Sequence, residues 1–160
     1  MESVVEGFTP FNTPRVAQLS QRSNQFNLRT VRYTEAEIAE LSQSQQHACF
    51  SFTLEDKFGD NGLICVIILE KQNKETLFVN TWFMSCRVLK RGMENFTLNT
   101  IVDYARQNGF KKIIGEYIPT LKNGMVKDHY PNLGFQPSGD NMYELQVDNY
   151  KNRECYIKRK

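Results

Sequence analysis

The residues best suited to chemistry are in the basic segment Arg87-Val88-Leu89-Lys90-Arg91-Gly92, which leaves one predicted strand and opens a predicted helix. A helix N-terminus presents free backbone N–H groups that bind anions. The N–H groups of Gly92 and Met93 and the three basic side chains are therefore typical of a phosphate site for the arm of a cofactor. A solvated basic turn would have the same composition, and spacing alone does not separate the two interpretations.

Cys86 directly precedes this segment and ends a strand predicted from Phe78 to Cys86. Strand alternation places it on one face with Phe78, Asn80, Trp82 and Met84. Positive charge beside a thiol favours the thiolate, which can accept an acyl group and pass it to a second thiol. Cys86 is thus a candidate nucleophile, and an inert cysteine buried in a strand is the alternative.

Two partial motifs carry a family resemblance. One is the basic segment, and the other is Asn123-x-x-Val126-x-x-x-Tyr130-x-x-x-Gly134-Phe135. Together they resemble the cofactor loop and the closing pattern of GNAT acyltransferases, although Lys90 replaces the loop's first glycine and would crowd a pyrophosphate. The resemblance implies that Asn123 helps to hold the cofactor and that Tyr130 acts as general acid toward the leaving thiolate. A core aromatic is the alternative for Tyr130.

A closer resemblance covers most of the chain, through segments Arg15–Leu19, Asn24–Leu28, Arg32–Thr34, Asp56–Gly62, Ser85–Leu89 and Tyr117–Asn123. These look like the C-terminal GNAT-like domain of FkbH-like proteins. The resemblance implies transfer of a glyceryl group from 1,3-bisphosphoglycerate to the phosphopantetheine thiol of an acyl carrier protein. It implies as partners this carrier protein and a haloacid-dehalogenase (HAD)-type phosphatase domain, in cis or in trans.

The phosphatase domain and its Asp-x-Asp metal site are missing from this sequence, so no metal is expected here. The expected cofactor is carrier-bound phosphopantetheine, or CoA. The four cysteines form no CxxC pair and lack zinc spacing, and we expect free thiols. Among them, Cys49 and Cys65 look like core residues and Cys155 like a tail residue.

Supporting catalytic groups are Glu116, which GNAT-type chemistry would use as a base, and His129, a second candidate base. His129 adjoins Tyr130, and neighbours on a helix face about 100° apart, so we do not expect both to reach one centre.

The substrate side of the site is assigned to polar residues of two loops. Asn24, Gln25 and Asn27 offer amide groups to a polyol acyl chain, while Asp60 and Asn61 could order a loop over the site. A turn held by side-chain hydrogen bonds is the alternative for the second group.

Two other functions remain open. One is CoA-dependent N-acetylation, with Glu116 or a water as base and Tyr130 as acid. The other is a non-catalytic domain that docks an acidic carrier protein through its basic loop and tail.

The elements that must position these residues are helices and strands, which the sequence distinguishes by apolar residues that recur about every 3.6 or every 2 positions. Thr13-Pro14 predicts the start of one helix and the capping box Thr34–Glu37 the start of another. Strands are predicted over residues 3–8, 48–54, 63–69, 78–86, 113–118 and 142–147, and helices over 93–108 and up to about residue 132. The fold class is α/β (α+β), with a GNAT-like three-layer arrangement of a mixed, mostly antiparallel sheet flanked by helices.

Length and charge limit the remaining possibilities. The 160 residues suffice for one domain, which we assign to residues 1–150, followed by a basic tail at 151–160. The tail has five basic residues against Glu154, a charge of +4, which leaves −2 for residues 1–150 out of a total of +2. A near-neutral body argues against nucleic-acid binding, and the tail suits a solvated end. No apolar run approaches the ~20 residues of a membrane span, and we expect a cytoplasmic protein with no membrane partner.

Overall fold

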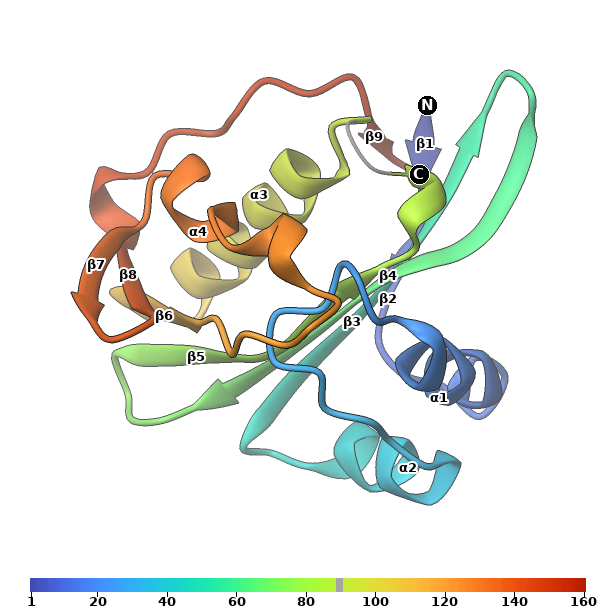
Figure 1. Cartoon of the computed structure of the whole chain (residues 1–160), viewed down its shortest axis with the longest axis horizontal. Helices are drawn as coiled ribbons and strands as arrows, with labels where there is room; N and C mark the ends of the chain where they lie inside the picture. Colours follow the sequence, from blue (N-terminus) through green and yellow to red (C-terminus); the bar gives the residue numbers. More distant parts are fainter. Residues whose placement is uncertain (89–90) are drawn as a thin grey trace.

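The computed structural model describes residues 1–88 and 91–160, which form a nine-stranded mixed sheet with helices on both faces (Figure 1). The strands are β1 (Glu2–Ser3), β2 (Val5–Glu6), β3 (His47–Asp56), β4 (Gly59–Lys71), β5 (Thr76–Met84), β6 (Lys112–Glu116), β7 (Gln136–Gly139), β8 (Met142–Gln146) and β9 (Lys158–Arg159). The helices are α1 (Thr13–Arg22), α2 (Glu35–Gln43), α3 (Met93–Gln107) and α4 (His129–Asn132), with 3-10 turns η1 (Cys86–Val88), η2 (Gly124–Val126) and η3 (Val147–Asn149). The predicted fold class is confirmed.

Strands run in the order β7-β8-β6-β5-β4-β3-β1-β9, and β2 also pairs with β3. The predicted meander is present, since β3, β4 and β5 pair antiparallel in sequence order. The centre of β4 is buried on both faces from Leu63 to Leu69, as its continuous apolar run predicts. The strand–helix–strand unit β5-α3-β6 makes the expected parallel pair.

Each face of the sheet has its own core. Helices α1 and α2 cover one face, where Val16, Leu19 and Ile38 pack on the sheet, and α3 covers the other face through Leu98 and Ile101. The capping box at Thr34 and Glu37 is present with both of its hydrogen bonds. Helix α1 differs from the prediction because its N-cap is Asn12, and the Thr13 hydroxyl donates to Thr9 O at 2.6 Å.

A β-bulge divides β5 into two halves. Val79 pairs with Leu69 and Thr81 pairs with Ile68, so Asn80 is an extra residue opposite β4. The parallel pairing of β5 with β6 also ends here, at Val79 opposite Gly115. Beyond the bulge the two strands therefore separate, and one edge of β5 is left without β6.

Residues 26–28 fill the edge that β6 leaves. Leu28 N donates to Trp82 O at 3.2 Å, and Met84 N donates to Phe26 O at 3.1 Å. On the far side, Ile118 N donates to Leu28 O at 2.8 Å. This wedge segment, Phe26–Leu28, thus lies between the end of β5 and the chain that continues from β6.

The bulge also corrects the predicted strand that ends at Cys86. β5 ends at Met84, and Cys86 begins the turn η1. The alternation is interrupted at Asn80, so Trp82 and Met84 join Val79 in the core beneath α3. The predicted single face from Phe78 to Cys86 is therefore wrong, because one inserted residue shifts every later side chain.

The tail is exposed over most of its length, as a solvated end would be, but it is not free. Lys158 and Arg159 pair in parallel with Glu2 and Ser3, and Ile157 is buried. Both chain ends meet at this edge of the sheet (Figure 1). Hydrophobic burial and backbone pairing thus hold a segment whose composition is typical of a free end.

Within the described residues, no helix is long and apolar enough to cross a bilayer.

Tyr130 packs so closely on β6 that Gly115 has no room for a side chain. A Cβ added at Gly115 would lie 2.4 Å from Tyr130 Cζ. We therefore expect Gly115→Ala to lower the free energy of unfolding by about 1–3 kcal/mol, the usual cost of overpacking a core, as measured by urea denaturation. Gly124→Ala is the matched control, because a Cβ there has no neighbour within 4 Å. Equal stability of the two variants would contradict the close packing.

Candidate functional site

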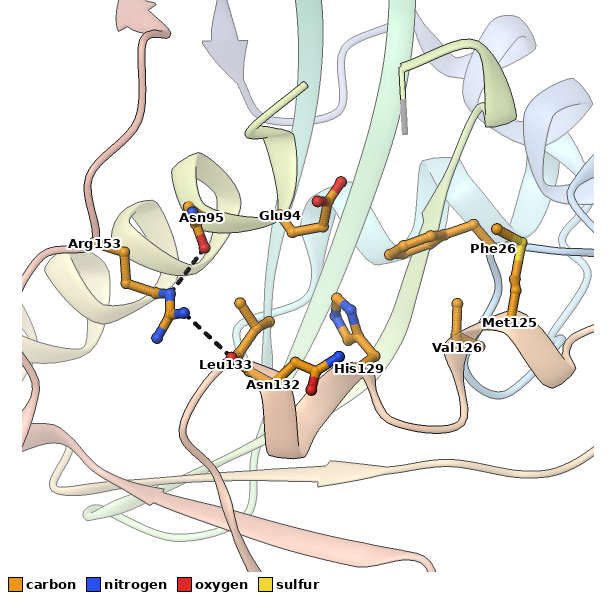
Figure 2. Close-up of a pocket in the computed structure, with 9 residues that line it drawn as sticks. All are labelled: Phe26, Glu94, Asn95, Met125, Val126, His129, Asn132, Leu133 and Arg153. Carbon is orange, nitrogen blue, oxygen red and sulfur yellow. Dashed lines mark hydrogen bonds between the residues drawn. The ribbon is translucent and has the colours of Figure 1, made fainter. Parts of the chain in front are cut away.

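A cleft of about 380 Å³ opens between the start of α3 and the region of η2 and α4 (Figure 2). Its walls come from four separate parts of the chain, and the lining residues are Phe26, Glu94, Asn95, Met125, Val126, His129, Asn132, Leu133 and Arg153. Phe26 belongs to the wedge segment, so the cleft lies directly beside the place where β5 and β6 separate. A concave site with a few polar groups is the usual form of a small-molecule pocket.

His129 is a buried residue that lines this cleft, and one of its ring nitrogens makes no hydrogen bond to the described residues. Its ring stands edge-on to Trp82, with centroids 4.3 Å apart, and edge-on to Phe26 at 5.0 Å. Its Nε2 has no hydrogen-bond partner among the described residues. Desolvation lowers the pKa of His129 to about 3, so the ring is neutral at physiological pH and is a weak base. Its unused nitrogen is instead suited to hydrogen-bonding a ligand.

Glu94 and Arg153 contribute the charged groups of the cleft. Glu94 Oε1 is buried without a partner in the described chain, and desolvation raises the pKa of its carboxyl. Arg153 Nε donates to Asn95 Oδ1 at 2.8 Å, and Nη2 donates to Asn132 O at 3.2 Å (Figure 2). Arg153 therefore holds the tail to both walls of the cleft.

Tyr130 lies behind this wall rather than in it. Its side chain is fully buried, and its hydroxyl has no partner within the described residues. Burial raises the pKa of this phenol above its ordinary value. Both rings pack on Trp82, with centroid distances of 4.3 Å for His129 and 6.2 Å for Tyr130, but only His129 lines the cleft. The two neighbours therefore do not both face this cavity, in keeping with the helical expectation.

Asn123 is a correction to the sequence assignment of cofactor-binding residues. It is completely buried, and its Nδ2 donates to Asn27 O at 3.0 Å and Ile118 O at 2.9 Å. Its Oδ1 accepts from Thr120 N at 2.7 Å and from Tyr117 OH at 3.3 Å. Every hydrogen-bonding position of the amide is used within the chain, so none remains for a cofactor.

Asn27 is likewise internal. It is buried, and its side chain bonds Ser23 O at 3.1 Å and Thr30 N at 2.8 Å. Its assignment to the substrate is therefore replaced by a structural role that holds the wedge segment in place.

Glu116 is paired rather than free. Arg29 Nε donates to Glu116 Oε1 at 3.0 Å, while Arg29 Nη1 donates to Asn80 O at 2.8 Å. The guanidinium also lies over the Phe78 ring, 5.0 Å from its centroid. Arg29 thus joins the bulge of β5 to the end of β6.

The residues of the predicted basic loop do not all line one cavity. Gly92 caps α3 in the left-handed region with φ of 87°, and Met93 is fully buried beneath it. Arg91 forms an ion pair with Asp56 at the β3–β4 hairpin. Lys90 lies outside the described residues.

Asp60 and Asn61 belong to the hairpin, away from the cleft. Asp60 Oδ1 accepts from Gly62 N at 2.7 Å, the side-chain turn considered as the alternative. Both residues line a separate surface cavity with Arg91.

Cys86, Arg87, Asn24 and Gln25 are brought together, but in a second cavity. Cys86 is exposed, and its Sγ donates to Gln25 Oε1 at 3.3 Å. This acceptor-side groove, as we call it, has a volume of about 630 Å³ and is lined by Leu19, Arg22, Ser23, Asn24, Gln25, Met84, Ser85, Cys86, Arg87 and Lys122. Cys86 is therefore not the buried strand cysteine of the alternative interpretation.

The other cysteines follow their predicted places only in part. Cys65 is buried, Cys49 is half-buried, and Cys155 packs against the core. Burial raises the pKa of Cys49 to about 12. No cluster of potential metal ligands occurs in residues 1–88 and 91–160.

Comparisons with known proteins agree on the fold. No protein-family model matches the sequence, and no curated protein matches it significantly. Among solved structures, the ribosomal-protein-S18-alanine N-acetyltransferase of Escherichia coli has a TM-score of 0.66 at 14% identity, over 96% of this chain and 99% of that chain. Spermidine N-acetyltransferase of Vibrio cholerae, in complex with CoA and spermine, has a TM-score of 0.68 at 13% identity, over 91% and 96%.

An N-acetyltransferase from Staphylococcus aureus Mu50 has a TM-score of 0.67 at 16% identity, over 92% of this chain and 99% of that chain. At these identities the likeness establishes the architecture, and the chain therefore has the GNAT fold.

Sequence reasoning missed Arg29, Glu94 and Arg153. Arg29 and Glu116 are 87 residues apart, and nothing local marks them as partners. Asn95 and Asn99 lie one turn apart on α3 and both hydrogen-bond Arg153. Two asparagines on one face of a helix are the sequence feature that could have indicated a polar contact between α3 and another segment.

The buried His129 makes stability depend on pH in a defined direction. Its folded pKa of about 3 lies below the ~6.5 of an unfolded histidine, so in this interval only the unfolded chain binds the proton. Falling pH therefore favours unfolding, by up to ~1.4 kcal/mol per pH unit from this group. We expect His129→Phe to show a shallower loss of stability from about pH 6 to about pH 4 in urea titrations.

His47→Gln is the control, since His47 is only half-buried and bonds the Ser44 hydroxyl. It should keep the slope of the original protein. An unchanged slope in His129→Phe would contradict the buried neutral imidazole.

Proposed function

We propose that this protein is an acyltransferase that takes its acyl group from a CoA thioester bound in the cleft beside α3. The observation that carries the proposal is the cleft's position, at the N-terminus of α3 and beside the separated ends of β5 and β6. The N-terminal turn of a helix of this length favours phosphate groups through its backbone N–H groups.

The polar groups of the cleft fit a phosphopantetheine arm. Such an arm carries amides that both donate and accept, and it would satisfy His129 Nε2 and Glu94 Oε1, which have no partner among the described residues. Glu94 Oε1 can accept a hydrogen bond from an amide N–H of the arm. Arg153 supplies the positive charge.

Each residue then has a limited role in the chemistry. The thioester itself supplies the activated acyl group, and an acceptor nucleophile attacks its carbonyl carbon as the thiolate leaves. His129 positions the donor through a hydrogen bond, since its low pKa makes it a poor base at neutral pH. Tyr130 supports the His129 and Trp82 rings from behind.

The structural neighbours favour this interpretation over the narrower one from sequence. Those compared above are N-acetyltransferases by their names, and one was solved with CoA. The FkbH-like link, with glyceryl transfer to a carrier protein, has no support among them.

Calorimetry with CoA tests the cleft. We expect binding by the original protein, and about tenfold weaker binding by Arg153→Gln, equivalent to ~1.4 kcal/mol, because the phosphate loses its cation. Arg153→Lys keeps the charge and should retain most of the affinity. Lys151→Gln removes the same charge from an exposed position two residues away and should have no effect. Absence of CoA binding at millimolar concentration would exclude the proposal.

A second function, transfer to the thiol of an acyl carrier protein, is favoured by one observation. Cys86 is exposed in a cavity that adjoins the cleft through the consecutive residues Gln25 and Phe26. In this scheme the Cys86 thiolate attacks the acyl-phosphate carbonyl carbon of the glyceryl donor and phosphate leaves. The carrier's phosphopantetheine thiol then attacks the resulting thioester and releases the Cys86 thiol, with a HAD-type phosphatase supplied in cis or in trans.

Intact mass after incubation with a glyceryl donor, the phosphatase and holo carrier protein tests this scheme. We expect an acylated form of the original protein and none of Cys86→Ala, while Cys155→Ala behaves as the original. Transfer to the carrier at an unchanged rate by Cys86→Ala would exclude Cys86 as the nucleophile. Binding of the carrier protein without acylation of the original protein would instead support a docking role.

A further inference from the structure

The acceptor-side groove has an unbalanced positive charge. Arg22, Arg87 and Lys122 all line it and all are exposed, and none of its described lining residues is a carboxylate. In the part of the chain that the structure describes, none of the three takes part in an ion pair, unlike Arg29, which is paired with Glu116. Their mutual repulsion would be relieved by a bound anion.

The side-chain amides of the groove offer hydrogen-bond donors beside these cations. Arg32 donates to Asn24 Oδ1, and the Cys86 thiol donates to Gln25 Oε1 at 3.3 Å. Both carbonyl oxygens are therefore used inside the protein, and the NH₂ groups of Asn24 and Gln25 are left as donors. A cavity lined by cations and N–H donors recognises a ligand rich in oxygen acceptors.

The groove is also placed to serve the cleft. Gln25 lines the groove and Phe26, the next residue, lines the cleft, so the two cavities share one wall. That wall continues into the wedge segment, which is anchored to the end of β5 by Met84 N and Phe26 O. A ligand in the groove would thus lie beside the same strand end as a donor in the cleft.

We propose that this groove binds a small metabolite through a phosphate or carboxylate group. If the protein is an acyltransferase, a point that rests on the proposed function, this metabolite is its second substrate. The anionic group contacts Arg22 and Lys122, and the amide N–H groups of Asn24 and Gln25 bind further oxygens of the same molecule. The volume of about 630 Å³ holds a small metabolite.

Protection of Cys86 from alkylation tests the site without an acyl donor. The full chain is treated with iodoacetamide, and the rate at each cysteine is followed by peptide mass spectrometry, with chloride used to keep ionic strength constant. We expect inorganic phosphate or succinate at millimolar concentration to slow modification of Cys86 at least threefold, with glycerol giving no protection. The half-buried Cys155 should be unaffected.

Two variants decide whether the protection comes from the groove. Arg22→Gln combined with Lys122→Gln should abolish protection, whereas Lys74→Gln combined with Lys151→Gln, an equal charge change at exposed positions elsewhere, should retain it. Protection by only phosphate or only succinate identifies the anionic group.

Equal protection in both double variants, or none by either anion in the original protein, would overturn the proposal. CoA calorimetry on the same samples separates this result from failure of the donor cleft, since the groove variants leave the cleft lining intact.

Discussion

One inserted residue, Asn80, determines how this sheet can hold a site. The bulge ends the pairing of β5 with β6, and Arg29 spans the gap by bonding Asn80 O and Glu116 together. A parallel pair that separates leaves backbone groups to be satisfied, and the wedge segment Phe26–Leu28 satisfies them. Asn123 in turn fixes the wedge by donating to Asn27 O. The charged bridge and this buried amide therefore hold the separated strands in one arrangement.

The two cavities follow from this arrangement. Because the wedge passes between the strand ends, it has one side facing α3 and α4 and another facing the end of α1. Within the described residues, the cleft on the first side has buried polar atoms without a hydrogen-bond partner, which suit a ligand with amides. The groove on the second side has cations that form no ion pair with any described residue, which suit an anion. The groove includes Met84 at the end of β5, and the cleft is tied to the same strand end by Phe26, whose carbonyl oxygen accepts from Met84 N.

The sequence analysis succeeded where a local rule was sufficient. Period-2 alternation identified β3, the continuous apolar run identified the centre of β4, and a reciprocal capping pair identified α2. It erred on Asn123, whose motif position is that of a cofactor ligand but whose amide is fully bonded within the chain. It also treated the tail as free, because composition does not show that Ile157 finds a core or that Arg153 finds Asn95.

The sequence by itself determined the fold class, the meander of β3, β4 and β5 and the helices α1, α2 and α3, because these elements follow patterns of residues that lie close together in the chain. Only the tertiary structure decided which candidate residues share a cavity. It separated Cys86 from His129, paired Glu116 with Arg29, and moved Asp60 to a distant hairpin. Those outcomes depend on contacts between residues far apart in the chain and on one bulge that shifts the register, and neither leaves a periodic pattern in the sequence.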